Sequence, residues 1–205
     1  GSGLERYAAV FPGVEINSTF YRRHKPSTFA RWAESVPAAF RFAVKMPKRI
    51  THELRLQDAE EACSLFLEDI EPLGNKLGPI LCQLPPSLAF DAVTVRDFFA
   101  SLRRTHSGAI VIEPRHASWA TAQAADLLER LSVDRVLADP TVMEPPATAS
   151  YMRLHGKPKV YYSPYAVQDL KAFAASLSAE SWCVFDNTAS GAAIDNALAM
   201  LDIVA

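Results

Sequence analysis

Short apolar runs alternate with amphipathic segments along most of the chain. The clearest run, Ala109–Ile112, is short and rich in β-branched residues, which is typical of a strand buried on both faces. Seven such runs predict strands: Gly13–Asn17, Phe40–Met46, Gly78–Leu84, Ala109–Ile112, Val133–Ala138, Ser150–His155 and Trp182–Phe185. Helical spacing predicts the intervening elements: Leu4–Phe11, Ser27–Val36 with Ser27 as N-cap, Asp58–Ile70, Val93–Arg104, Thr121–Leu131, Val167–Ser176 and Ser190–Leu201. The segment Pro47–Gln57 is expected to be a loop.

Alternating strands and helices predict βαβ units and a parallel sheet. A doubly wound sheet would normally carry a glycine-rich phosphate loop after an early strand, and the sequence has none. We therefore predict an α/β fold, a TIM-barrel-like (β/α) barrel that forms a single domain over residues 1–205. A barrel of this kind has eight strands, and the position without a predicted strand lies before Leu4. The first strand is therefore expected to be missing from this chain.

Side-chain alternation divides each predicted strand into two faces. One face carries only apolar residues and is expected to pack against helices. The other face is small or apolar early in the strand and polar at its end, which places charge at the carboxyl end of a barrel, where such folds keep their active sites. We assign to this second face the pairs Glu15 and Asn17, Ala43 and Lys45, Leu81 and Gln83, Val111 and Glu113, Leu137 and Asp139, Arg153 and His155, and Val184 and Asp186.

Composition narrows the class of protein. The formal net charge is -2, so overall basicity does not favour a nucleic-acid-binding protein. The three cysteines have no metal-site spacing, and Cys82 and Cys183 lie in strand-like runs, so both are expected to be small core residues of a protein from a reducing compartment. No run of about 18 apolar residues and no signal peptide is found, and we expect a cytoplasmic protein without membrane contact.

Several segments resemble those of domain-of-unknown-function family 72 (DUF72), the YecE-like proteins. They occur in the family's order: Val14–Arg22, Phe40–Pro47 with Ile50–His52, Gln83–Pro86, Ile112–His116 with Ser118–Trp119, Tyr151–Gly156 with Tyr161–Tyr162, and Phe185–Gly191. The resemblance implies a TIM-barrel-like fold of uncharacterised activity. The family normally opens with a strand that ends in a Gly-[Thr/Cys]-[Ser/Ala]-Gly-Trp-like motif. This motif is absent here, in agreement with the missing first strand.

Polar strand ends supply the candidate catalytic residues. Glu113 is the first choice for a general acid or base, because it ends an apolar strand. Pinning of this carboxylate by Arg115 or Arg153 is the structural alternative. His116 and His155 are candidate proton carriers, Lys45 is a candidate anion ligand or Schiff-base lysine, and Asp186 completes the catalytic set. Substrate binding is predicted for Glu15, Asn17, Tyr21, His52, Gln83, Arg115, Asp139, Arg153, Tyr162, Asn187, Ser190 and Gly191.

The loops after the strands are basic, and this bears on the partner. Their cations are Arg22, Arg23, His24, Lys25, Lys48, Arg49, Arg55, Lys157 and Lys159. Thr188–Ala192 opens the last helix with Ser190 and Gly191, in the region where many barrels bind phosphate. Tyr161, Tyr162 and Tyr165 could form an aromatic lip or pack the loop. Surface solvation is the plainer explanation for each single charge. The set favours a small anionic molecule as ligand, with the oligomeric state left open.

We therefore predict an enzyme that performs acid–base chemistry on a small anionic or phosphorylated substrate at the carboxyl-terminal rim, without a cofactor. Two alternatives stay open. Glu15, Glu113, Asp139, His155 and Asp186 resemble the scattered ligands of metal-dependent barrel hydrolases or isomerases, but no HxH or HExxH motif supports a metal site. The basic face could instead serve a non-enzymatic module that binds a nucleotide or nucleic acid, which is possible but not favoured.

Overall fold

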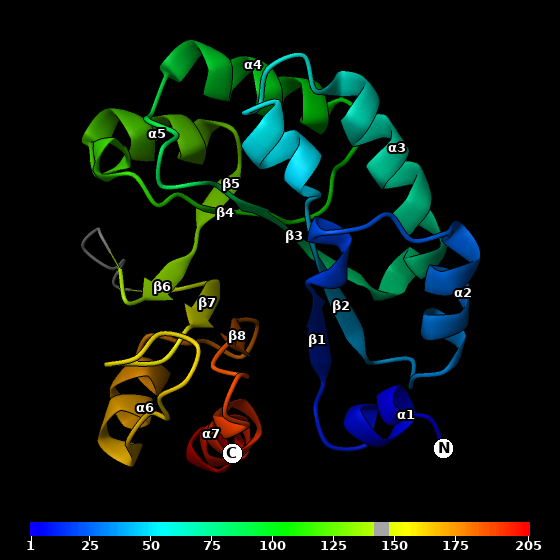
Figure 1. The fold of residues 1–205 in the computed structure, drawn as a ribbon, viewed down its shortest axis with the longest axis vertical. Coiled ribbons are helices and arrows are strands. Elements are labelled where there is room, and N and C mark those ends of the chain that lie inside the picture. The colour runs from blue at the N-terminus through cyan, green and yellow to red at the C-terminus, as the bar shows by residue number, and fades with distance from the viewer. Residues whose placement is uncertain (142–147) are drawn as a thin grey trace. The chain divides into compact units, whose positions relative to one another are not determined.

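The computed structural model describes residues 1–141 and 148–205 (Figure 1). The chain divides into two compact units, which we call the N-terminal unit (Gly1–Val133) and the C-terminal unit (Asp134–Ala205). Each is described by itself. The strands form two sheets, one in the order β1-β2-β3-β4-β5 and one in the order β6-β7-β8, and every strand pair with a determined register is parallel. The predicted α/β class with parallel strands is confirmed. The single domain over residues 1–205 stays a prediction.

The larger sheet is built from strands whose central residues are buried on both faces. Phe42 and Val44 of β2 lie on the face opposite Ala43, and all three are at most 1% exposed. The same is true of Ile80 and Leu81 in β3, so both faces of the sheet are covered. The strands are β1 (Gly13–Ile16), β2 (Arg41–Lys45), β3 (Leu77–Gln83), β4 (Ile110–Glu113) and β5 (Val133–Arg135).

The helices that follow β1 to β4 lie along one side of the larger sheet, whereas the first helix precedes β1 (Figure 1). Their apolar faces supply buried residues such as Phe29, Phe66, Phe99 and Leu128. The helices are α1 (Gly3–Ala8), α2 (Pro26–Glu34), α3 (Glu60–Ile70), α4 (Ala92–Arg103) and α5 (Ala122–Arg130), with short turns η1 (Ser18–Phe20), η2 (Arg49–Glu53), η3 (Glu71–Lys76) and η4 (Ala117–Trp119). No helix within residues 1–141 and 148–205 is long and apolar enough to cross a membrane.

The C-terminal unit has its own core beneath two helices. Strands β6 (Leu137–Asp139), β7 (Tyr151–Leu154) and β8 (Trp182–Phe185) pair side by side, and α6 (Val167–Ala174) and α7 (Ala192–Val204) pack together. The core includes Leu137, Met152, Leu154, Leu170 and Met200. Cys183 packs against this core, whereas Cys63 and Cys82 are buried in the N-terminal unit, and all three thiols are free.

Three local predictions are wrong, each for a physical reason. Ser27 is not the N-cap of α2; Lys25 is, because Pro26 occupies the first helical position, where its missing N–H costs nothing. The loop predicted over Pro47–Gln57 contains the π-helical turn η2. The strand predicted over Val133–Ala138 is interrupted at Val136 and becomes β5 and β6. This interruption decides on which face of the smaller sheet Asp139 lies.

Candidate functional site

The polar ends of β2, β3 and β4 lie on one face of the larger sheet. Lys45 pairs with Leu81, and Gln83 pairs with Glu113. Paired residues in a parallel sheet point to the same face, and residues two apart on a strand do so as well. Lys45, Gln83 and Glu113 therefore share a face, as alternation predicts. Glu15 pairs with Ala43, which places Glu15 on that face too.

Glu113 and Arg115 form an ion pair at the end of β4. Arg115 donates from Nε to Oε1 of Glu113 at 2.8 Å, and a second guanidinium nitrogen lies 2.6 Å from the same oxygen. The Glu113 side chain is 1% exposed, whereas that of Arg115 is 30% exposed. The structural alternative in which Arg115 pins Glu113 is thus observed. A buried carboxylate held by a half-exposed guanidinium remains able to bind or orient a charged ligand.

Lys45 and His52 both contact the aromatic ring of Phe20. The Lys45 ammonium lies 4.3 Å from the centre of Phe20, and the His52 ring packs edge-on to Phe20 at 4.9 Å. The hydroxyl of Thr51 lies 2.8 Å from Nδ1 of His52. Burial lowers the pKa of His52, and the nearby cations Lys45, Lys48, Arg115 and Arg55 lower it further. His52 is therefore held in its neutral form amid positive charge.

Other predicted residues of the N-terminal unit make local contacts. Asn17 donates to Oε1 of Glu15 at 2.6 Å, and Gln83 donates to the carbonyl of Leu84 at 2.6 Å. His116 is the N-cap of η4, because its Nδ1 accepts the backbone N–H of Ser118 at 3.1 Å. Tyr21 is 80% exposed and touches Phe20 edge-on. His116 therefore caps a short helical turn, a structural role that was not predicted from its position in a loop.

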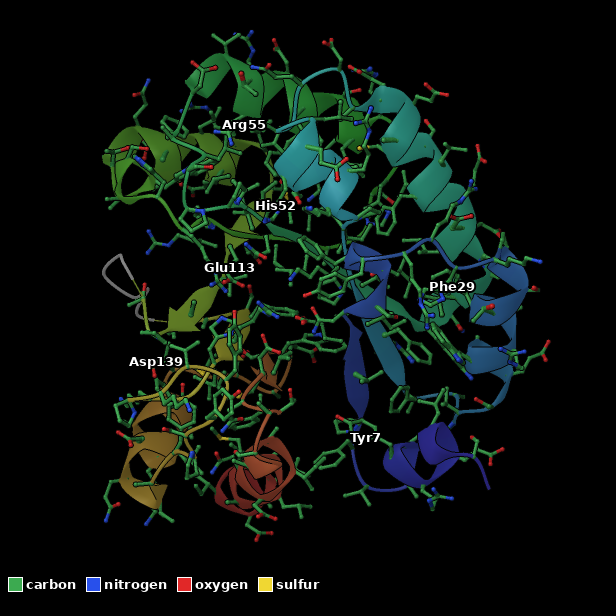
Figure 2. The ribbon with its side chains drawn as sticks, viewed as in Figure 1. Tyr7, Phe29, His52, Arg55, Glu113 and Asp139 are labelled. Carbon is green, nitrogen blue, oxygen red and sulfur yellow. The ribbon has the colours of Figure 1, made fainter. Side chains whose placement is uncertain are left out.

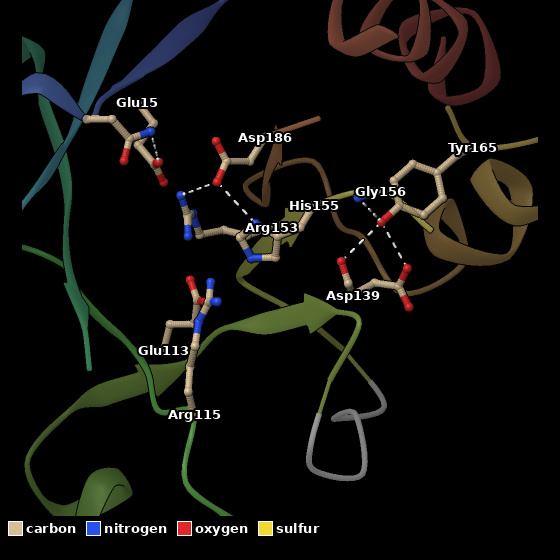
Figure 3. A network of polar contacts seen from close by, with 10 residues as sticks. Glu15, Glu113, Arg115, Asp139, Arg153, His155, Gly156, Tyr165 and Asp186 are labelled. Atoms are coloured by element: carbon tan, nitrogen blue, oxygen red, sulfur yellow. Dashed lines mark hydrogen bonds and ion pairs between the residues drawn. The ribbon is translucent and has the colours of Figure 1, made fainter. Parts of the chain in front are cut away.

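The C-terminal unit contains a cluster of three ionisable side chains at the ends of β7 and β8 (Figure 3). Nδ1 of His155 and a guanidinium nitrogen of Arg153 each lie 3.1 Å from Oδ2 of Asp186. Arg153 pairs with Val184 along the strands, so His155 and Asp186, each two residues further on, are level with one another. The side chains of Arg153 and His155 are 1% and 2% exposed, and that of Asp186 is 23% exposed.

Asp139 does not join this cluster, and the prediction that Leu137 and Asp139 share a face with Arg153 is wrong. Arg153 pairs with Ala138, so Leu137 and Asp139 lie on the opposite face of β6. Leu137 accordingly belongs to the core beneath the helices. Asp139 accepts a hydrogen bond from the Tyr165 hydroxyl at 2.9 Å, as Figure 3 shows. The break at Val136 shifts the alternation by one residue.

The loop after β7 and the turn before α7 are joined by backbone and side-chain contacts. The Ser190 hydroxyl donates to the carbonyl of Tyr162, whose side chain is exposed. Gly191 is the N-cap of α7 with φ +83°, a conformation that glycine adopts without strain. Asn187 is fully buried and donates to the carbonyl of Ser163 and to Asn196. Asn187 therefore holds the loop in place.

Many cations of the predicted basic loops have partners within their own unit. Arg23 binds both carboxylate oxygens of Asp69. Glu53 attracts Lys48 and Arg49, and Arg55 donates to the hydroxyl and carbonyl of Ser87. In the C-terminal unit, Lys157 lies 3.4 Å from Asp169, and Lys159 lies over the ring of Tyr162 at 3.9 Å. The basic character of these loops is thus partly structural.

Two contacts that matter here were not expected from the sequence. Phe20 joins Lys45 to His52, and Asn196 of α7 donates to the carbonyl of Tyr165 while accepting from its N–H. Neither contact could be predicted from the alternation of residues along strands, because Phe20 and Asn196 lie outside strands. Within residues 1–141 and 148–205, no three His, Cys, Asp or Glu side chains are grouped closely enough to hold a metal ion.

The model of the family described as "Protein of unknown function DUF72" matches residues 1–205 of this chain. The chain belongs to the DUF72 family. This confirms the resemblance seen in the sequence segments. Among curated relatives, the UPF0759 protein YecE of Escherichia coli is 37% identical over 84 residues, which are 41% of this chain and 31% of YecE. The UPF0759 protein YunF of Bacillus subtilis is 30% identical over 89 residues, which are 40% of this chain and 32% of YunF. The matched segments thus span about a third of these relatives.

Solved structures confirm the fold of the DUF72 chain. A DUF72 family protein from Thermotoga maritima superposes with a TM-score of 0.85 at 26% identity, over 98% of this chain and 88% of that one. One from Enterococcus faecalis gives a TM-score of 0.86 at 21% identity, over 99% and 88%. A xylose isomerase-like TIM barrel/4-hydroxyphenylpyruvate dioxygenase fusion protein gives 0.55 at 16% identity, over 97% and 39%. The TIM-barrel-like character of the fold follows, and the activity of the family is uncharacterised.

Proposed function

We propose that this protein is an enzyme that performs acid–base chemistry on a small anionic or phosphorylated substrate, with His155 as the proton-transferring residue. The observation that carries the proposal is the contact of His155 Nδ1 with Asp186 Oδ2, an oxygen that Arg153 also approaches. A carboxylate at Nδ1 fixes the ring and its tautomer, so that the ring exchanges its proton through Nε2. Asp186 is then a positioning residue, and Arg153 keeps it in place.

Stability alone gives no good reason for this cluster. Three ionisable side chains gather where Arg153 and His155 are almost fully buried, and burying charges costs several kcal/mol per ion before their attraction is counted. Hydrophobic residues of similar volume would serve the core at least as well. Clusters of this kind are frequent at functional sites, where their charge is put to chemical use. Asp186 is the member that solvent reaches.

The anionic character of the substrate is supported by the segment that follows β7. Lys157 and Lys159 stand in the loop next to His155, and both are exposed. Tyr161 of the same loop packs edge-on to the His155 ring at 5.8 Å, so the loop and the proton-carrying residue are in contact. Cations beside a general acid or base hold a phosphate or carboxylate group close to the atom that gains or loses a proton.

A turnover screen tests this proposal. Phosphorylated and carboxylated metabolites are incubated with the protein, with and without divalent metal ions, and followed by NMR. We expect at least one compound to be converted, and His155→Gln to slow that conversion by about 10²-fold or more, the usual contribution of a general acid or base. Conversion at the parental rate by a folded His155→Gln protein would contradict the role of His155. A protein that converts no compound in the screen would contradict the proposal as a whole.

A further inference from the structure

We propose that Tyr161 is a substrate-binding residue of the His155 site and that its ring packs against the flat face of a ring in the substrate. The inference rests on the proposed function, because it concerns the same site. It narrows the substrate class to phosphates or carboxylates that carry a ring. All the residues involved lie in the C-terminal unit.

Tyr161 contacts the proposed proton carrier through both its backbone and its side chain. The Tyr161 N–H donates to the carbonyl of His155, and the two rings pack edge-on with their centres 5.8 Å apart. The carbonyl of Tyr161 accepts the N–H of Ala189, in the turn before α7, at 3.0 Å. Tyr161 is therefore fixed between the end of β7 and the start of α7, and a group that lies on its ring is close to His155.

The backbone of Tyr161 is strained and its side chain is exposed, a combination that stability alone does not favour. Its φ is +68°, in the left-handed region, where any residue with a Cβ atom is disfavoured. The side chain is 43% exposed, so the ring withdraws only part of its apolar surface from water. Strained residues cluster at ligand-binding sites, where the surrounding structure holds them in place.

The loop after β7 is held by contacts at several points. Gly156 has a φ of +91°, and a Cβ at this position would lie 2.6 Å from the carbonyl oxygen of Ser163. The Gly156 N–H donates to the Tyr165 hydroxyl, which donates in turn to Asp139, labelled in Figure 2. The fully buried Asn187 donates to the Ser163 carbonyl at 3.0 Å. A loop that is ordered before the ligand arrives loses less conformational entropy on binding.

The chemistry of this loop fits an anion that carries a ring. Aromatic side chains pack against flat faces, either of another aromatic ring or of the C–H groups of a sugar ring. The ammonium group of Lys159 lies 3.9 Å from the centre of the Tyr162 ring, and a cation in this position keeps its charge. The loop therefore offers an aromatic surface together with positive charge, and a ring-bearing anion can use both.

The test compares ring-bearing phosphates with open-chain phosphates that have the same number of carbon atoms. Phenyl phosphate is paired with n-hexyl phosphate, and a hexopyranose phosphate is paired with a hexitol phosphate. Binding to the full chain is measured by calorimetry at constant ionic strength. In at least one pair, we expect the ring-bearing member to bind about fivefold more tightly or better, and that pair identifies the ring as aromatic or sugar. Equal affinity within both pairs, or no binding of any of the four compounds, would overturn the inference.

Two substitutions of Tyr161 and one control show whether its ring is responsible. Tyr161→Phe keeps the flat face and should keep the preference for a ring. Tyr161→Leu keeps an apolar side chain under the same backbone strain but has no flat ring, so it should bind the two members of a pair equally. Leu198→Ala shortens an exposed apolar side chain of α7 and should keep the preference. A preference that survives in Tyr161→Leu would overturn the role of Tyr161.

A measurement on the parent protein needs no variant. Nuclear Overhauser effects between the Tyr161 ring and the bound ring are expected, and a complex without them would overturn the inference even if Tyr161→Leu failed to fold. Binding is measured without turnover, so the inference and the proposed function fail separately. A ring preference that depends on Tyr161 in a protein that converts no compound would support the inference and contradict the proposed activity. Conversion by a protein without any ring preference would overturn the inference alone.

Discussion

Replacing Tyr165 by phenylalanine removes one hydroxyl that serves two partners in the C-terminal unit. The hydroxyl accepts the backbone N–H of Gly156 at 2.8 Å and donates to Oδ2 of Asp139 at 2.9 Å. Tyr165 is buried in the core between β6 and the helices, so water cannot readily take its place. In Tyr165→Phe, the Gly156 N–H loses its acceptor and Asp139 loses a donor.

The magnitude follows from these two losses. A buried N–H without an acceptor costs about 1–3 kcal/mol, and a hydrogen bond to a charged group contributes about 1.5–3 kcal/mol. The contributions overlap, and Asp139 keeps partial access to solvent and to Lys157, so we expect a net loss of about 2–3 kcal/mol. For a chain of this length, about 1 kcal/mol lowers Tm by about 2–4 °C. The melting temperature should therefore fall by about 4–12 °C.

Urea unfolding followed by circular dichroism and by tryptophan fluorescence measures the effect. Trp182 lies in β8 of the same unit, so the fluorescence signal includes the region that is changed. Tyr162→Phe is the matched control, because it removes a hydroxyl from an exposed side chain on the same loop, and it should alter stability by less than about 0.5 kcal/mol. Burial and the neighbouring Asp139 raise the pKa of Tyr165, so the difference should not change between about pH 6 and pH 9. Equal stability of Tyr165→Phe and the parent would show that the Tyr165 hydroxyl does not stabilise the C-terminal unit.

Two further predictions concern titratable groups. Burial raises the pKa of Cys63 and of Cys183 to about 12. These thiols should therefore react slowly with a disulfide reagent at about pH 8 in the native protein, and all three cysteines should react once the chain is denatured. Rapid labelling of the native protein would contradict this prediction. Burial and the nearby Arg103 lower the pKa of His106. The stability that comes from burying neutral His106 is therefore fully present above about pH 6.5, the ordinary pKa of histidine, and is lost as the pH falls through the lowered pKa. The free energy of unfolding should therefore decrease from about pH 7 to about pH 5, and less so in His106→Gln; equal slopes in the two proteins would count against this cause.

Much of the fold could be predicted from the sequence where strands are short and apolar. The strand Trp182–Phe185 has the predicted bounds, and the faces of β1 to β4 follow from simple alternation. Alternation fails after Val136, because the residues around the break between β5 and β6 give no local signal of it. The single-residue shift moves Asp139 to the face that Tyr165 covers.

The contacts of the candidate sites could be predicted only in part. Glu113 and Arg115 are two residues apart at a strand end, so their pairing was among the expected alternatives. The contact of His155 with Asp186 joins residues 31 positions apart and depends on the register of β7 and β8, which the sequence does not specify. The capping role of His116 depends on the turn η4, which is too short to show a periodic pattern.

In the proposed reaction Asp186 positions His155 for proton transfer, and a comparison of two Asp→Asn variants measures this role. Asp186→Asn and Asp202→Asn make the same chemical change, the second on an exposed residue of α7 in the same unit. With a substrate from the turnover screen, we expect kcat/KM of Asp186→Asn to fall by about 10²-fold or more, at unchanged secondary structure, while Asp202→Asn keeps the parental value. Equal kcat/KM values for the two variants would contradict the account.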